Sequence, residues 1–220
     1  AGFLRRTYPE YRIHLYQTLA QHAFNTGHAY WGWRFAGWAL HYVQDLTQPY
    51  HTTVLPGVSV ARMLWINTLD LMGAHRSKRD VITLVSNRHA ALENYQYRRM
   101  HAAYLAKNND DALLRASRES PAITAAPYTS NMVRQRISLE SHLAADATDA
   151  MLEKVLPAKY ISDPAYILGE TEPDLDMLAV MASLTHEQQE KMSGAVSNLM
   201  KNFGIYTQIF IIKIHPLRTN

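Results

Sequence analysis

Apolar residues recur at intervals of three and four positions along most of the chain, a spacing typical of amphipathic helices. Between these stretches stand Gly, Pro, Asn and Asp residues, which favour turns and helix ends. The pattern predicts helices over the following ranges: Tyr11 to Asn25, Ala29 to Asp45, Val58 to Met72, Ser77 to Lys107, Asp110 to Arg118, Ile137 to Leu156, and Thr185 to about Ile214. It predicts loops over Ser120 to Asn131 and over Pro157 to Asp176, the second of them mobile. The predicted fold class is therefore all-α, a multi-helix bundle.

The helix predicted over Ala29 to Asp45 is apolar on almost every side. Its large side chains are aromatic: Tyr30, Trp31, Trp33, Phe35, Trp38 and Tyr42. A helix of this kind is expected at the centre of a bundle, with its rings in the core. Exposed rings would instead suit stacking against the bases of single-stranded nucleic acid.

The composition narrows the classes of function. Hydrophobic residues make up 47% of the 220 residues and charged residues 19%, which indicates a globular chain rather than a disordered one. We expect a single helical domain over residues 1–220. The net charge of +3 would help an anionic substrate to approach, but it is too small to indicate a nucleic-acid binder by itself. The chain has no Cys, so a metal ion would have to be held by His, Asp and Glu, ligands that suit zinc.

Candidate chemistry is concentrated in residues 41–51, HYVQDLTQPYH. On a helix the side chains of His41 and Asp45 project from one face, one turn apart. Pro49 turns the chain, so His51 can fold back toward the same point. These three ligands could hold one divalent ion, or two neighbouring ions that share Asp45. The alternative is a buried hydrogen bond between His41 and Asp45 that only satisfies two polar groups in the core.

Two further pairs have the same spacing of four residues on predicted helices. His89 and Glu93 form the first pair, and His142 and Asp146 form the second. Taken alone, such a pair is weak support for a metal site, because His and a carboxylate four residues apart often form a surface ion pair.

The motif HYVQDLTQPYH resembles the signature of the superfamily of zinc-dependent bacterial phospholipases C and single-strand-specific nucleases. The resemblance covers these positions: His41, Tyr42, Asp45, Gln48, Pro49 and His51. The aromatic run before His41 is also similar to the helix that precedes the signature in that family. The fold that this resemblance implies is a helical bundle in which up to three zinc ions share a cleft.

The resemblance also implies a set of metal ligands. His41 and Asp45 would ligate one zinc, and Asp45 would also reach a second. His51, His89 and Glu93 would hold the remaining ion. The stretch from His51 to His89 is longer than in typical members, so an inserted helix is expected there. His142 and Asp146 are the alternative to His89 and Glu93.

The chain also departs from the family. Members carry further ligands upstream of the signature, including an N-terminal Trp and an Asp that is thought to orient the attacking water. The residues before His41 do not supply them, because His14, His22 and His28 fall where the family has ordinary helix. We therefore expect either a missing N-terminal segment or an incomplete site that holds one or two zinc ions.

The function that the resemblance implies is hydrolysis of a phosphoester bond, of the phospholipase C type, by metal-activated water and without a protein nucleophile. The substrate would be a phospholipid headgroup or single-stranded nucleic acid, with transient contact to a membrane surface and no obligate protein partner. Two alternatives are a single-strand nuclease of the same superfamily and a non-catalytic helical module with a degenerate metal site. Relatives are exported, so the resemblance implies a secreted or periplasmic protein.

Overall fold

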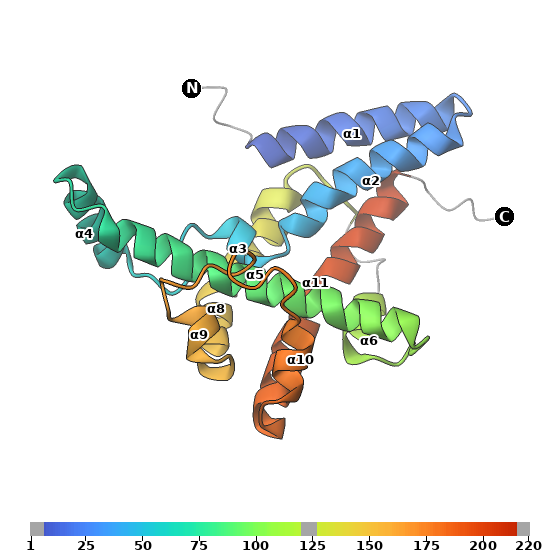
Figure 1. Cartoon of the computed structure of the whole chain (residues 1–220). Helices are drawn as coiled ribbons and strands as arrows, with labels where there is room; N and C mark the ends of the chain where they lie inside the picture. Colours follow the sequence, from blue (N-terminus) through green and yellow to red (C-terminus); the bar gives the residue numbers. More distant parts are fainter. Residues whose placement is uncertain (1–6, 120–126, 215–220) are drawn as a thin grey trace. The chain divides into compact units, whose positions relative to one another are not determined.

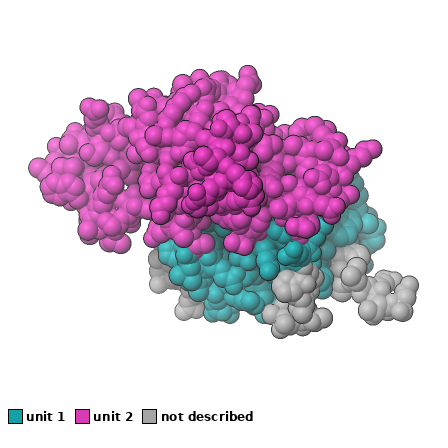
Figure 2. Space-filling model, turned by 90° about the horizontal axis from the view of Figure 1, so that it is seen from below, with its two compact units in different colours: residues 1–52, 116–143, 199–220 teal, residues 53–115, 144–198 magenta. Residues whose placement is uncertain are grey.

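The computed structural model describes residues 7–119 and 127–214, and every regular element in these ranges is helical (Figure 1). This confirms the all-α class that the spacing of apolar residues predicted. The chain divides into two compact units, which Figure 2 distinguishes by colour. Unit 1 comprises Ala1–Thr52, Ala116–Leu143 and Leu199–Asn220, and unit 2 comprises Thr53–Arg115 and Ala144–Asn198.

Unit 1 begins with a hairpin of two helices, α1 (Tyr8–Asn25) and α2 (Ala29–Asp45), which lie side by side (Figure 1). A capping box of Thr7 and Glu10 starts α1, so this helix begins at Tyr8 rather than at the predicted Tyr11. Gly27 has a φ of 81° and permits the tight turn that separates the two helices. The bounds of α2 are those that the sequence predicted.

The buried face of α2 consists of small residues, which corrects the expectation of a buried aromatic helix. Gly32, Ala36, Ala39 and Val43 are buried. A Cβ atom at Gly32 would lie 2.5 Å from the ring of Phe24 on α1, so this ring packs directly over Gly32 and leaves no room for a larger residue there. The tryptophans of α2 lie beside this buried face: Trp33 contacts Phe24 and Trp38 contacts Tyr16, both on α1. These rings are nevertheless exposed: Tyr30, Trp31, Trp33 and Trp38.

The remaining elements of unit 1 cover the other side of this hairpin. They are α3 (Pro49–Thr52), the π-helix η3 (Val133–Ser138), α7 (Leu139–Leu143) and residues 199–214 of α11 (His186–Ile214). One cluster of buried residues joins the hairpin to η3, to the residues just before it and to α11: Ile13, Ala20, Ala36, Ala39, Val43, Tyr128, Met132, Val133, Ile137, Tyr206, Ile209, Phe210 and Ile214. The core of unit 1 thus combines three segments that are far apart in the sequence.

Unit 2 is organised around one long helix, α5 (Arg76–Leu105). Four shorter helices contact α5, namely α4 (Val60–Leu71), α8 (Ala145–Val155), α9 (Ala158–Ile161) and α10 (Met177–Ala182). Two helices cross the division between the units: α6 (Ala112–Arg118) and α11. The helix α4 lies where a helix was predicted over Val58 to Met72, and the side chain of Ser59 caps its start by accepting a hydrogen bond from the N–H of Arg62 (3.3 Å).

Two segments differ from the sequence prediction. The helix expected over Ile137 to Leu156 is interrupted, because η3, α7 and α8 replace it. The helix α10, which Asp176 caps, was not predicted, since a helix this short shows little periodicity. The last helix, α11, has nearly the predicted bounds, and Gly204 within it packs closely against the carbonyl of Ser117, where a Cβ would not fit. Residues 120–126 of the predicted loop lie outside the described residues.

No helix among the described residues is both long enough and apolar enough to cross a membrane.

Candidate metal centre

His51 lies on α3, the short helix that follows the end of α2 in unit 1. Pro49 is buried and stands at the first position of α3, where its missing N–H breaks no helical hydrogen bond. The N–H of His51 donates to the carbonyl of Gln48 (3.0 Å), and the hydroxyl of Thr52 donates to that of Ser141 on α7 (3.1 Å). These contacts fix the turn, and the side chain of His51 remains exposed.

His41 and Asp45 meet on the last turns of α2, as their spacing predicted. His41 Nε2 lies 3.3 Å from Asp45 Oδ2, and their side chains are 66% and 37% exposed. The pair is therefore not a buried hydrogen bond in the core, which was the alternative interpretation. Within residues 7–119 and 127–214, neither residue belongs to a group of three ligands close enough to hold one ion, so their role as ligands stays a prediction.

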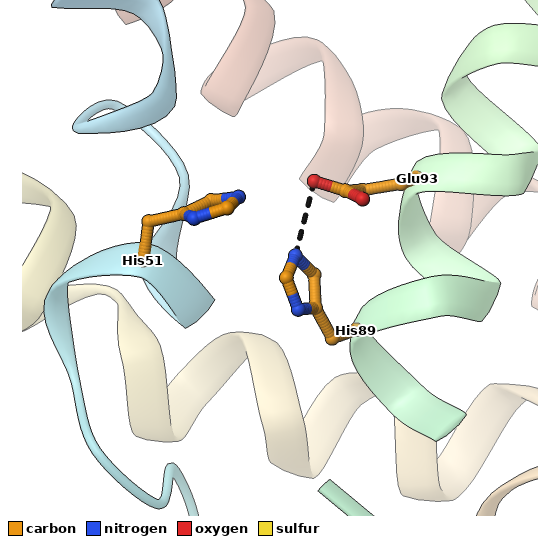
Figure 3. A group of neighbouring side chains, drawn as sticks. All are labelled: His51, His89 and Glu93. Atoms are coloured by element: carbon orange, nitrogen blue, oxygen red, sulfur yellow. Dashed lines mark ion pairs between the residues drawn. The ribbon is translucent and has the colours of Figure 1, made fainter. Parts of the chain in front are cut away.

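His89 and Glu93 form the second predicted pair, and both lie on α5 in unit 2. His89 Nε2 lies 3.0 Å from Glu93 Oε1, and the two side chains are 28% and 47% exposed (Figure 3). The pair is thus closer than His41 and Asp45, and its histidine is less exposed, whereas its carboxylate is more exposed. An imidazole and a carboxylate one helical turn apart are the kind of paired ligands that helices supply to zinc.

Figure 3 also draws His51, the third member of the predicted ligand group. The resemblance groups it with His89 and Glu93, a set of two imidazoles and one carboxylate, and this grouping stays a prediction. His51 belongs to unit 1, whereas His89 and Glu93 belong to unit 2. This donor chemistry fits zinc, and two His with one Glu is a ligand set that hydrolytic zinc enzymes use.

Two asparagines hold α5 in place on either side of the pair. Asn87 donates from Nδ2 to the carbonyl of Tyr166 (2.7 Å) and accepts from the N–H of Leu168 (2.9 Å). Asn94 makes the same double contact, donating to the carbonyl of Leu175 (3.1 Å) and accepting from the N–H of Met177 (3.0 Å). The connection after α9 is therefore tied to the part of α5 that carries His89 and Glu93.

The anchoring role of these asparagines was not predicted from the sequence, although a signal was present. Asn is unfavourable inside a helix, because its side chain competes for backbone hydrogen bonds. An asparagine in the middle of a long helix therefore suggests a partner outside that helix. Asn87 and Asn94 both follow this rule.

Asp146, in the alternative pair with His142, has a structural partner in the same unit. Its Oδ1 accepts a hydrogen bond from the backbone N–H of Gly57 (2.9 Å). Gly57 has a φ of 75° and forms part of the turn that leads into α4. This contact gives Asp146 a role in holding that turn, and it makes His89 and Glu93 the better candidates for a metal site.

A buried ion pair lies close to the same part of α5. Arg88 Nη1 donates to Asp149 Oδ2 on α8 (2.7 Å), and the side chains are 9% and 1% exposed. The guanidinium also pairs with Glu153 and donates from Nε to the carbonyl of Ile161 (3.0 Å). Because its donors are taken by these groups, Arg88 serves to fix α5 against α8 and α9.

No protein-family model matches the chain, and comparisons with curated proteins and with solved structures also find no match.

Proposed function

We propose that this protein is a zinc-dependent phosphoester hydrolase of the phospholipase C type. The observation that carries the proposal is the pair of His89 and Glu93, whose imidazole nitrogen and carboxylate oxygen lie 3.0 Å apart on α5. In the proposal, His51 completes the ligand set with these two residues. The resemblance of residues 41–51 to the zinc-dependent superfamily supports the same assignment from the sequence.

Three protein ligands suit a catalytic site better than a structural one. Structural zinc sites are closed by four protein ligands, whereas catalytic sites keep a position open for water or substrate. When bound, zinc would neutralise phosphate oxygens and lower the pKa of a coordinated water to about 7. The chain itself supplies the two imidazoles, the carboxylate and a rigid α5 that holds two of these ligands.

His41 and Asp45 would contribute to a second ion. Their exposed side chains leave both ligand atoms accessible, and Asp45 lies in the last turn of α2, shortly before His51 in the chain. We therefore propose one to two zinc ions for this chain.

The proposed substrate is a phospholipid headgroup rather than a polynucleotide. A protein that binds nucleic acid tightly usually neutralises several phosphates with Lys and Arg. The net charge of +3 is low for such a role. One phosphodiester of a headgroup requires no extended basic surface.

The first experiment measures bound metal by elemental analysis in the purified chain and in His89→Ala, Glu93→Gln and His51→Ala variants. The expected result is one to two zinc ions per chain, with one ion lost in each variant. His101→Ala is the matched control, because His101 is an exposed histidine on the same helix and should change nothing.

The same proteins are then assayed with a nitrophenyl phosphodiester. Hydrolysis should require zinc and should fall at least a hundredfold in Glu93→Gln. The proposal is wrong if the chain binds no zinc at stoichiometric levels. Zinc that binds without any turnover would instead support a non-catalytic module.

A further inference from the structure

Unit 1 exposes a continuous surface of aromatic rings on the α1–α2 hairpin. We define this aromatic face by six residues: Tyr8, Tyr16, Trp31, Phe35, Trp38 and Tyr42. Trp31 stacks on Phe35 at 6.0 Å between ring centroids, and Phe35 contacts Trp38 edge-to-face at 5.5 Å. The series of ring contacts continues onto α1, because the ring of Trp38 contacts that of Tyr16 at 5.3 Å between centroids.

The exposure of this face follows from the packing of α2. Small residues fill much of the buried face of α2, and of the rings only Tyr16, Phe35 and Tyr42 are partly buried against the core. Trp31 remains 50% exposed, Trp38 43% and Tyr8 59%. Tyr30 and Trp33 add further exposed rings beside the face. Contiguous apolar surfaces of this kind mark sites of interaction rather than ordinary solvent-facing surface.

The charges on the face are positive. Arg12 donates to the hydroxyl of Tyr8 (2.7 Å) and to that of Tyr16 (3.0 Å). The guanidinium carbon of Arg34 lies 5.8 Å from the centroid of Trp38. The one carboxylate of α2 is Asp45, which is partly exposed in the last turn of the helix, where it pairs with His41. The fully exposed residues of α2 are Ala29, Tyr30, Trp31, Trp33, Arg34, Gly37, Trp38 and His41. The partner should therefore be both apolar and negatively charged.

We propose that the α1–α2 hairpin docks through its aromatic face onto the surface of an anionic phospholipid bilayer. Trp and Tyr prefer the boundary between headgroups and acyl chains, because one part of each ring system is apolar and the other forms hydrogen bonds. Arginines next to such rings can reach lipid phosphates while their stems stay on apolar surface. The helix lies on the bilayer and does not cross it.

The ring geometry disfavours single-stranded nucleic acid as the occupant. Base stacking requires free, flat ring faces that follow one another along a basic groove. Here the contacts of Trp38 with Phe35 and Tyr16 are edge-to-face, at interplanar angles of 72° and 65°. Among the described residues two arginines, Arg12 and Arg34, lie over these rings, which is few for a phosphate backbone.

This inference is independent of the proposed zinc site, because the aromatic face uses none of His51, His89 and Glu93. The test measures cosedimentation of the whole chain with vesicles of phosphatidylcholine alone and of phosphatidylcholine with phosphatidylglycerol. We expect binding to the mixed vesicles and at least tenfold weaker binding to the neutral ones. Chelation of zinc should leave both results unchanged.

Variants locate the contact. Trp31→Ala combined with Trp38→Ala should weaken binding at least tenfold, while circular dichroism stays that of the unsubstituted chain. Trp65→Ala is the matched control, because Trp65 is 62% exposed on α4 in unit 2. Arg12→Gln with Arg34→Gln should reduce the preference for anionic lipid without removing binding. Brominated lipid should quench tryptophan fluorescence, and the Trp65→Ala chain should be quenched at least as strongly.

Several outcomes would overturn the inference. Absence of binding to the mixed vesicles is the first, and binding that the double tryptophan variant leaves intact is the second. A dimer that dissociates in this variant, without vesicle binding, would identify a second copy of the chain as the occupant. Tight binding of a single-stranded oligonucleotide in place of vesicles would identify nucleic acid.

Discussion

The carboxylate of Asp149 is almost completely buried in unit 2, and Arg88 neutralises it there. Gly57 packs directly against this carboxylate, since a Cβ at that position would lie 2.1 Å from Asp149 Oδ2. A buried charge that loses its partner is strongly destabilising, by about 3–5 kcal/mol. The geometry around Asp149 therefore tolerates little change at Gly57.

We predict that Gly57→Ala destabilises the protein much more than Gly73→Ala. Both glycines have positive φ, 75° and 89°, so each alanine would incur backbone strain of about 1–2 kcal/mol. Only at Gly57 would the new methyl group also displace the buried carboxylate, because nothing lies within 4 Å of a Cβ at Gly73. Urea unfolding measures both free energies. Equal losses of unfolding free energy in the two variants would show that the Asp149 carboxylate can move aside without destabilising the protein.

Tyr206 is another buried polar residue, and it lies in the core of unit 1. Its hydroxyl donates to Glu140 Oε2 on α7. Burial and this carboxylate together raise the pKa of Tyr206 well above its ordinary value. In the unfolded chain the phenol ionises at a pH of about 10, whereas in the folded protein it keeps its proton. The unfolded state is therefore favoured as the pH rises above this value.

Tyr206→Phe should consequently weaken the alkaline loss of stability. The stability that the phenol contributes is fully present below about pH 10 and is lost above it, by at most about 1.4 kcal/mol per pH unit. Unfolding in urea between pH 8 and pH 11 gives the slope for both chains. The slope should not vanish, because Tyr128 and Tyr166 also have raised pKa values. An unchanged slope would contradict the prediction.

At the scale of elements, α5 carries the organisation of unit 2. Asn87 and Asn94 tie the connection between α9 and α10 to this helix through backbone atoms on both sides. The sequence predicted a mobile connection from its Pro and Gly content, whereas these four hydrogen bonds anchor it at two points. Hydrogen bonds of this kind are each worth about 1 kcal/mol.

Asn87→Ala combined with Asn94→Ala should release this connection. Limited proteolysis is expected to cut the variant between residues 162 and 176 several times faster than the unsubstituted chain. Ser86→Ala is a suitable control, because Ser86 is exposed on the same helix. Equal cleavage rates would mean that other contacts hold the connection.

Features of these helices that depend on local signals were predicted from the sequence, whereas features that depend on distant contacts were not. The helix over Ala29 to Asp45 was predicted with correct bounds, because local signals mark both of its ends. The turn at Gly27 precedes the helix, and Pro49 follows it. Which face of this helix is buried could not be predicted, since rings and small residues are equally apolar in the pattern. The spacing of His89 and Glu93 predicted their ion pair for the same local reason. The anchoring asparagines depend on contacts distant in sequence, which periodicity does not report.

At the scale of the whole molecule, the proposed zinc ligands come from both units. An ion that binds only the folded chain stabilises it, by about 2.7 kcal/mol when its concentration is a hundred times the Kd. Zinc at such a concentration should therefore raise the Tm of the unsubstituted chain and of His101→Ala. The Tm of His51→Ala and of Glu93→Gln should respond much less. A rise of the same size in all four proteins would contradict the assigned ligands.

The interleaving of the units along the chain has a consequence for synthesis on the ribosome. The first segment of unit 1 ends at Thr52, and its last segment begins at Leu199. At about 5–20 residues per second, the α1–α2 hairpin waits on the order of ten seconds for the part of α11 that completes its core. During that time its apolar side chains are open to chaperones. Ribosome-bound chains that stop before residue 199 should accordingly be cut by protease within the hairpin, and chains in which residues 199–214 have emerged should resist.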